Sequence, residues 1–445
     1  MAKDSNLMTE GDYRKKILLF ALPLFIGSLF QQLYNTVDSL IVGNLVSASA
    51  LAAVSSTGSL IYLLIGFFMG FSSGAGIVVA RNIGAQNARE TEKAVHTSVA
   101  MGLFFSAVLT VLGVFWSPAI LRWMGTPEDV LPLAELYLKI YFGGSFALVM
   151  YNTFVGILQA SGDSRHPLYY LVASSILNVI LDVVFIAVFH MGVDGAALAT
   201  VISECFSMVL SLIRLLKTDD LIRLNLKKIG FNSDHLAMIL RYGFPTALQA
   251  CVIDLSNILI QSYINSFGSQ AMAGLGAYSK IDGFAFLPVT AFSLSLSTFV
   301  SQNLGAGKKE RMKQGIRFGL SCSIIMIEII GILFFTFAPQ IIRMFNADPE
   351  VIAFGAGKAK VCCLFYFLLG FSHVTSAVMR GVGKPMAPMI VMLVCWCAVR
   401  VVVFMTVGQV FHDIRLTYWI YPFTWGLSSA AYLLYMRKLR TEGIL

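Results

Sequence analysis

Five polar residues in the first half of the sequence have types and spacing that could form a cation site. Asp38 lies in LYNTVDSLIVG, Asn178 and Asp182 in LNVILDVVF, and Thr200 and Glu204 in ATVISECF. Asn178 and Asp182 are four residues apart, as are Thr200 and Glu204, so each pair shares one face of a helix. All five lie in strongly apolar stretches, where a charged group is expensive and indicates a functional site.

Three carboxylates, an amide and a hydroxyl in one half of the chain predict a site that exchanges one cation for another. A low dielectric and a neighbouring like charge disfavour an ionised carboxylate, whereas a bound cation favours it. Oxygen ligands suit hard cations, so the site could hold a proton, a sodium ion or an organic cation. The alternative is structural: such carboxylates can also pair with polar groups where helices pack.

Gln31, Tyr34 and Asn152 are candidates for binding substrate together with Glu204. Gln31 and Tyr34 precede Asp38 by seven and four residues, so they share its helical face. Pro23 lies earlier in the same apolar run, and a proline kinks a helix because it removes a backbone hydrogen bond. We expect Pro23 to act as a hinge or to produce a static bend.

Composition excludes most other classes of protein. Of 445 residues, 57% are hydrophobic and 13% charged, against about 25% charged in soluble chains. A soluble enzyme, a disordered chain and a DNA-binding domain are therefore excluded, and a multi-pass membrane protein remains. The net charge of +8 fits basic cytoplasmic loops better than nucleic-acid binding. The seven cysteines lie in apolar stretches and show no zinc or disulfide spacing.

The chain is expected to be an all-α integral membrane protein with twelve transmembrane helices. The twelve apolar runs extend from about 17–42 to 415–436, six in each half. They predict an N-terminal lobe over 1–216, a cytoplasmic linker over 217–235 and a C-terminal lobe over 236–445. Most Lys and Arg outside the runs fall in the two ends, the linker and two loops. These are the second loop, with Arg81, Arg89 and Lys93, and the eighth loop, with Lys308, Lys309, Arg311 and Lys313. Both termini should therefore face the cytoplasm.

The two halves repeat each other. Asn82-Ile83-Gly84-Ala85 corresponds to Asn303-Leu304-Gly305-Ala306 at an offset of 221, and three further matches lie within one residue of that register. Six runs per half is an even number, so the lobes should be related by a pseudo-two-fold axis along the membrane normal. In this register Asp182 corresponds to Val403. The second half has Asp254, Lys280, Asp282 and Glu328 scattered over three runs and Arg400 in the eleventh, so coupling is expected in the first half.

Several motifs together resemble the multidrug and toxic compound extrusion (MATE) family over nearly the whole chain. They are MTEGDYRKKILLFALP, QQLYNTVDSLIVG, VARNIGAQN with its echo VSQNLGAG, QASGDSRHP with its echo MRGVGKP, and NVILDVVF followed by GVDGAALAT. By this resemblance Asp38, Asn178, Asp182 and Thr200 match coupling residues, which would bind the metal ion if sodium drives transport. Gln31 and Tyr34 match pocket positions, and Pro23 matches a bending proline.

The expected function is secondary antiport, with organic cations or drugs exported in exchange for protons or sodium. No GxxxxGK[ST] motif and no catalytic Ser, Cys or His constellation occurs, so we expect neither an enzyme nor a cofactor, apart from sodium if it is the coupling ion. The expected partners are small organic cations, H⁺ or Na⁺ and membrane lipid, with no nucleic acid, and the protein should be a monomer in the inner (cytoplasmic) membrane. The alternative is a flippase for a lipid-linked sugar precursor, which should show a cationic cleft for phosphates.

Overall fold

The computed structural model describes residues 7–45, 48–123, 126, 128 and 130–444. Within these ranges, side chains are described except at 35–45, 48–53, 55–56, 59–60, 62–63 and 254. The side chain of Asp38 is therefore outside the described residues.

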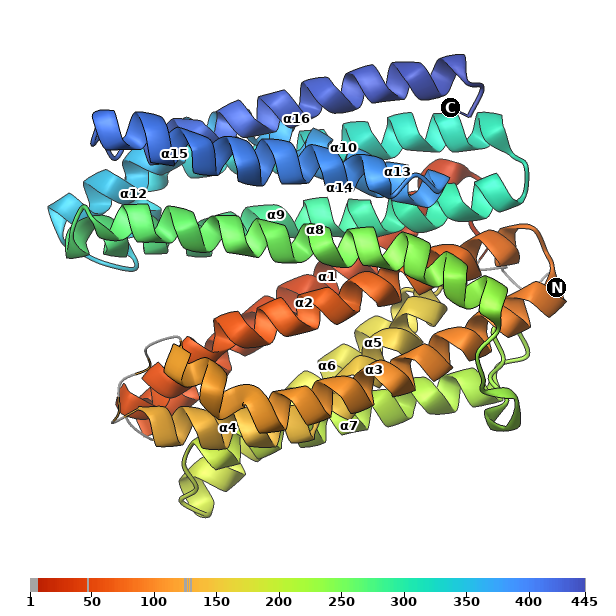
Figure 1. Ribbon diagram of the computed structural model, residues 1–445, viewed down its shortest axis with the longest axis horizontal. Helices are drawn as coiled ribbons and strands as arrows, with labels where there is room; N and C mark the ends of the chain where they lie inside the picture. Colours follow the sequence, from red (N-terminus) through yellow and green to blue (C-terminus); the bar gives the residue numbers. More distant parts are fainter. Residues whose placement is uncertain (1–6, 46–47, 124–125, 127, 129, 445) are drawn as a thin grey trace. The chain divides into compact units, whose positions relative to one another are not determined.

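The described chain is helical throughout and contains no strand (Figure 1). The first half comprises α1 (Tyr13–Leu45), α2 (Ala48–Gly84), α3 (Ala88–Trp123), α4 (Leu131–Gly143), α5 (Ser145–Ala160), α6 (Arg165–Asp182), the π-helical turn η1 (Val183–Val188) and α7 (Val193–Lys217). A short 3-10 turn, η2 (Leu226–Lys228), lies in the connection between the halves. The second half comprises α8 (Ser233–Asn265), α9 (Ser269–Gly305), α10 (Lys309–Thr336), α11 (Ala338–Arg343), α12 (Pro349–Cys362), η3 (Cys363–Phe365), α13 (Tyr366–Val382), α14 (Met386–Met392), the π-helical turn η4 (Leu393–Ala398), α15 (Val399–Val410) and α16 (Leu416–Thr441).

These helices form the twelve predicted spans. Among the described residues, ten are long and apolar enough to cross a membrane, and α4 with α5, bent by 47°, makes an eleventh. The helix α16 is not among these by apolarity, but its 26 residues are long enough to cross at 1.5 Å per residue and make it the twelfth. The prediction of an all-α membrane protein with twelve helices is confirmed.

The chain divides into two compact units that do not coincide with its two halves. Unit 1 consists mainly of Ile26–Ala247, and unit 2 of Met8–Phe25 with Leu248–Leu445. The helices α1 and α8 therefore each begin in one unit and end in the other. Each carries an internal proline shortly before the change, at Pro23 and Pro245. A proline leaves one backbone carbonyl without its helical partner, so each of these helices has a weak point near the change of unit.

In unit 1, the first part of α8 packs closely on α2 because both helices carry glycine at the contact. A Cβ atom on Gly74 would lie only 2.5 Å from the backbone nitrogen of Gly243, and one on Gly70 only 2.4 Å from backbone atoms of Ala247. Small residues let helix backbones approach in this way. Asn82 belongs to the repeated motif, and its Nδ2 atom lies 3.4 Å from Nε2 of His235 in the first turn of α8.

In unit 2, the segment that leads into α1 is held by the matching copy of that motif. Asn303 donates from Nδ2 to the carbonyl of Met8 at 3.3 Å, and Gln302 Oε1 accepts from the Met8 N–H at 2.8 Å. Arg311 donates to the carbonyls of Met8, Glu10 and Gly11. The repeated motif thus has the same structural task in both units, since it binds the start of the helix that passes between them.

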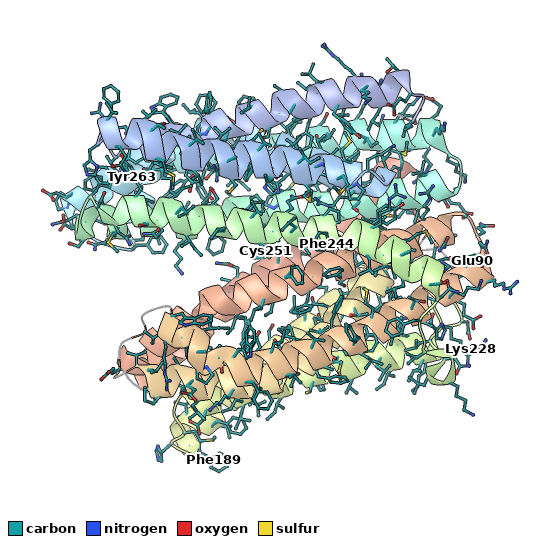
Figure 2. All side chains as sticks on the ribbon, in the orientation of Figure 1. Glu90, Phe189, Lys228, Phe244, Cys251 and Tyr263 are labelled. Carbon is teal, nitrogen blue, oxygen red and sulfur yellow. The ribbon has the colours of Figure 1, made fainter. Side chains whose placement is uncertain are left out.

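The connection over 217–235 packs within unit 1. The Nε2 atom of His96 on α3 lies 3.1 Å from the carbonyl oxygen of Asn225. Lys228 Nζ forms an ion pair with Glu92 Oε1 at 2.6 Å. Figure 2 shows Lys228 and Glu90 at the same end of unit 1, opposite Phe189. The second loop and this connection therefore lie on one side of the unit.

Candidate functional site

Three of the predicted coupling residues meet between α6 and α7 in unit 1. With its amide oriented to match its neighbours, Asn178 donates to Asp182 Oδ2 at 2.9 Å and accepts from the Thr200 N–H at 3.1 Å. Asn178 and Asp182 are 1% and 0% exposed, and Thr200 is also buried. The four-residue spacing predicted a shared face for Asn178 and Asp182, and the structure shows it.

A change in helix type follows Asp182 directly. Asp182 is the last residue of α6, and the π-helical turn Val183–Val188 begins after it. A π-helical turn accommodates one extra residue per turn and is frequent at functional sites. It also alters which residues face α7 beyond this point, so the polar face of α6 ends with Asp182.

This arrangement provides the buried carboxylate of Asp182, the side-chain amide of Asn178 that is hydrogen-bonded to it, and the hydroxyl of Thr200 nearby. Thr200 donates its hydroxyl to the carbonyl of Ala196 at 3.0 Å, which leaves its oxygen lone pairs as acceptors. A carboxylate, an amide oxygen and a hydroxyl oxygen are suitable donors for a sodium ion, and the carboxylate alone can accept a proton. In the described part of the chain, no group of three or more His, Cys, Asp or Glu side chains is arranged for a metal ion, so a transition-metal site is not indicated there.

The other predicted site residues lie on several elements. Gln31 is exposed and Tyr34 half-buried on α1. Glu204 is half-buried on α7, one turn beyond Thr200, and lies near Tyr151 of α5. Pro23 is half-buried within α1, where the structure gives one static arrangement.

Asn152 lines a separate pocket of unit 1, formed by α2, α3 and α5. Its amide donates to the Leu148 carbonyl at 2.9 Å, and its own carbonyl accepts from Ser72 at 3.1 Å. The remaining lining is mostly apolar and aromatic and includes Phe68 and Phe105. The pocket offers few hydrogen-bonding groups, which suits an apolar or aromatic ligand.

Sequence reasoning missed a charged cluster in unit 2. Asp282 of α9, Lys358 of α12 and Arg400 of α15 come together around Tyr278 and Tyr421. The expectation that the charged residues of this half are scattered is therefore wrong for Asp282 and Arg400, which meet Lys358 here. The signal in the sequence is Lys358, a lysine within the apolar stretch 353–380.

The comparisons with known proteins agree with this architecture. The sequence model of the MatE family matches the chain twice, over residues 23–184 and 245–406. The chain is 29% identical over 392 residues to "Probable multidrug resistance protein YpnP" of Bacillus subtilis, with 88% of each covered. It is 25% identical over 401 residues to a protein of Shewanella oneidensis named "FAD transporter", with 88% of this chain and 87% of the relative covered. A solved structure described as MATE in the bent conformation shares the fold with a TM-score of 0.92 at 23% identity, covering 100% and 99% of the two chains.

Twelve helices in two repeats define a multi-pass membrane transporter of the two-lobe type. More particularly, the chain belongs to the multidrug and toxic compound extrusion (MatE) family, because the family model matches most of its length. The two matches begin 222 residues apart, which confirms the internal repeat.

Proposed function

We propose that this transporter exports organic cations, including drugs, in exchange for protons or sodium ions. The observation that carries the proposal is the buried Asp182, whose carboxylate accepts a hydrogen bond from Asn178. A buried carboxylate is stable when it is neutralised. Relatives named for multidrug resistance support the choice of substrate.

The coupling follows from the charge on this site. With a bound organic cation the carboxylate is neutralised, and when a proton or sodium ion arrives from outside it takes over that role and the substrate leaves. The ion need only favour one conformation over the other by its differential affinity. One elementary charge that crosses 100 mV supplies about 2.3 kcal/mol.

We also propose that both termini face the cytoplasm in a bacterial inner membrane. In unit 2 the basic eighth loop lies beside both ends of the chain: Lys309 donates to the Gly443 carbonyl at 2.8 Å, and Lys308 to the Thr9 carbonyl at 2.9 Å. In unit 1 Lys228 lies at the end that carries the basic second loop (Figure 2). Such grouping of basic residues supports the cytoplasmic side.

The test is ethidium uptake into inside-out vesicles under an imposed pH gradient or an imposed sodium gradient. Wild type should accumulate ethidium under one of the two gradients, which names the ion. Asp182→Asn and Asp38→Asn should abolish this uptake, whereas Asp219→Asn, which removes an exposed acid in the connection, should leave it unchanged. No uptake by folded wild type under either gradient, or full uptake by Asp182→Asn, would contradict the proposal.

The second candidate function is movement of a phosphate-bearing molecule such as a lipid-linked sugar precursor. The buried Lys358 and Arg400 of unit 2 favour it, and the relative named for FAD transport indicates that proteins similar to this one are not all named for drugs. Vesicles that move such a precursor but no ethidium would favour this candidate.

A further inference from the structure

The charged cluster of unit 2 contains two buried basic side chains that lie on the same aromatic ring. Lys358 is 3% exposed and Arg400 1% exposed. Lys358 Nζ lies 4.3 Å and Arg400 Cζ 4.4 Å from the ring centroid of Tyr421. Lys358 also lies over Tyr278 at 5.0 Å, and Arg400 over Trp396 at 5.0 Å. Cation–π contacts of this kind stabilise a cation only partly.

The nearby carboxylate does not neutralise the pair. Asp282 Oδ1 accepts hydrogen bonds from the hydroxyls of Tyr278 at 3.1 Å and Tyr366 at 2.7 Å. Among the described residues, the ion pairs with N···O within 4.0 Å include neither Lys358 nor Arg400. Among the described side chains of this cluster, two cations and one carboxylate leave an excess of one positive charge.

Arg400 also has unused hydrogen-bonding capacity. Its Nε donates to Thr424 Oγ1 at 3.2 Å, but Nη2 is buried and has no partner in the described part of the chain. A guanidinium presents its donors as a planar fork that matches two oxygens of a carboxylate or phosphate. A buried donor without a partner is costly, so an oxoanion at this place would satisfy both the free donor and the excess charge.

Corresponding helices of the internal repeat carry different buried polar groups in the two units. The two family matches cover Asn178 in unit 1 and Arg400 in unit 2, so the two residues lie on corresponding helices of the repeat. Asn178 accepts a hydrogen bond from the Thr200 backbone N–H on the following helix, and Arg400 donates one to the Thr424 hydroxyl on the following helix. In unit 1 the acidic Asp182 accompanies Asn178, whereas in unit 2 the basic Lys358 accompanies Arg400 on the ring of Tyr421.

We propose that unit 2 carries a binding site for an oxoanionic group, a carboxylate or a phosphate, held by Arg400 and Lys358. The aromatic side chains around the two cations favour a ligand in which the oxoanion is attached to an apolar or aromatic body. Tyr421 and His373 at the cluster are half-buried, so part of its aromatic border is exposed. The ligand is either a dissolved organic anion or the headgroup of an anionic lipid.

The test is calorimetric titration of the purified full chain in phosphatidylcholine nanodiscs with phenyl phosphate, and with benzyl alcohol as the uncharged analogue. Wild type should bind phenyl phosphate and not benzyl alcohol. Arg400→Gln and Lys358→Gln should each weaken binding at least tenfold, equivalent to about 1.4 kcal/mol, because each removes a charge-assisted contact. Arg380→Gln is the matched control, because Arg380 belongs to the same unit but donates to Ser376 at 2.7 Å.

The same titration in nanodiscs that also contain phosphatidylglycerol separates the two sources of the oxoanion. Weaker binding of phenyl phosphate there, in wild type, indicates that the lipid headgroup occupies the site; equal binding indicates a dissolved ligand. The proposal is overturned if wild type binds phenyl phosphate no better than benzyl alcohol, or if a folded Arg400→Gln or Lys358→Gln variant binds it as tightly as wild type. Should Arg400→Gln fail to fold, Lys358→Gln alone decides. No ion gradient is used, so the result is independent of cation antiport.

Discussion

Replacing Gly74 by alanine should destabilise the packing of α2 on α8 within unit 1. The new Cβ atom would lie 2.5 Å from the backbone nitrogen of Gly243 and 2.9 Å from the Ile239 carbonyl oxygen. Ordinary contact begins at 3.4 Å, so the helices must separate by roughly 0.9 Å, since backbone atoms cannot rotate away. Overpacking of this kind costs about 1–3 kcal/mol.

Gly76→Ala is the matched control on the same helix. Its Cβ atom would meet only the Gly156 carbonyl at 3.6 Å, and both substitutions gain the same helix propensity of about 1 kcal/mol. At roughly 2–4 °C per kcal/mol for a unit of this size, Gly74→Ala should unfold about 2–12 °C below Gly76→Ala. Thermal unfolding of the detergent-solubilised variants, followed by tryptophan fluorescence, measures this difference. Equal unfolding temperatures would refute the close approach of the two helices.

Three further perturbations have definite expected outcomes. Asn178→Ala removes the hydrogen bond to the carboxylate of Asp182, worth about 1.5–3 kcal/mol for a charged partner, and should lower gradient-driven ethidium uptake at least tenfold; unchanged uptake would separate Asn178 from coupling. Arg311→Lys loses the planar fork that reaches the carbonyls at the start of α1, so hydrogen exchange should show a less protected Met8 amide; unaltered protection would contradict this role. Lys228→Met breaks an exposed ion pair and should change the free energy of unfolding by less than about 1 kcal/mol in a denaturant titration; a larger loss would mean that the pair anchors the connection.

The membrane class, the twelve helices and the internal repeat could be predicted from the sequence. Apolar runs of about 20 residues can cross a bilayer only as helices, because unpaired backbone groups are too costly there. The repeat was readable since Asn82 and Asn303 lie in the same short motif. The pairing of Asn178 with Asp182 was also predictable, because residues four apart share a helical face.

The sequence did not show that α1 and α8 each belong to two units. Their apolar runs are continuous, and hydropathy contains no information about which helices a segment packs against. That depends on close contacts between distant residues, such as Gly74 with Gly243 and Met8 with Gln302.

What the sequence by itself determined is the class of protein, the helices and the local spacing of polar residues along each helix. Only the tertiary structure decided which of those residues meet. Asn178 reaches the Thr200 backbone across two helices, and Lys358 joins Arg400 on one tyrosine ring although 42 positions separate them in the chain. The physical reason is that helical periodicity acts over one or two turns, whereas the charge of a buried cluster is set by packing between helices that are remote in sequence.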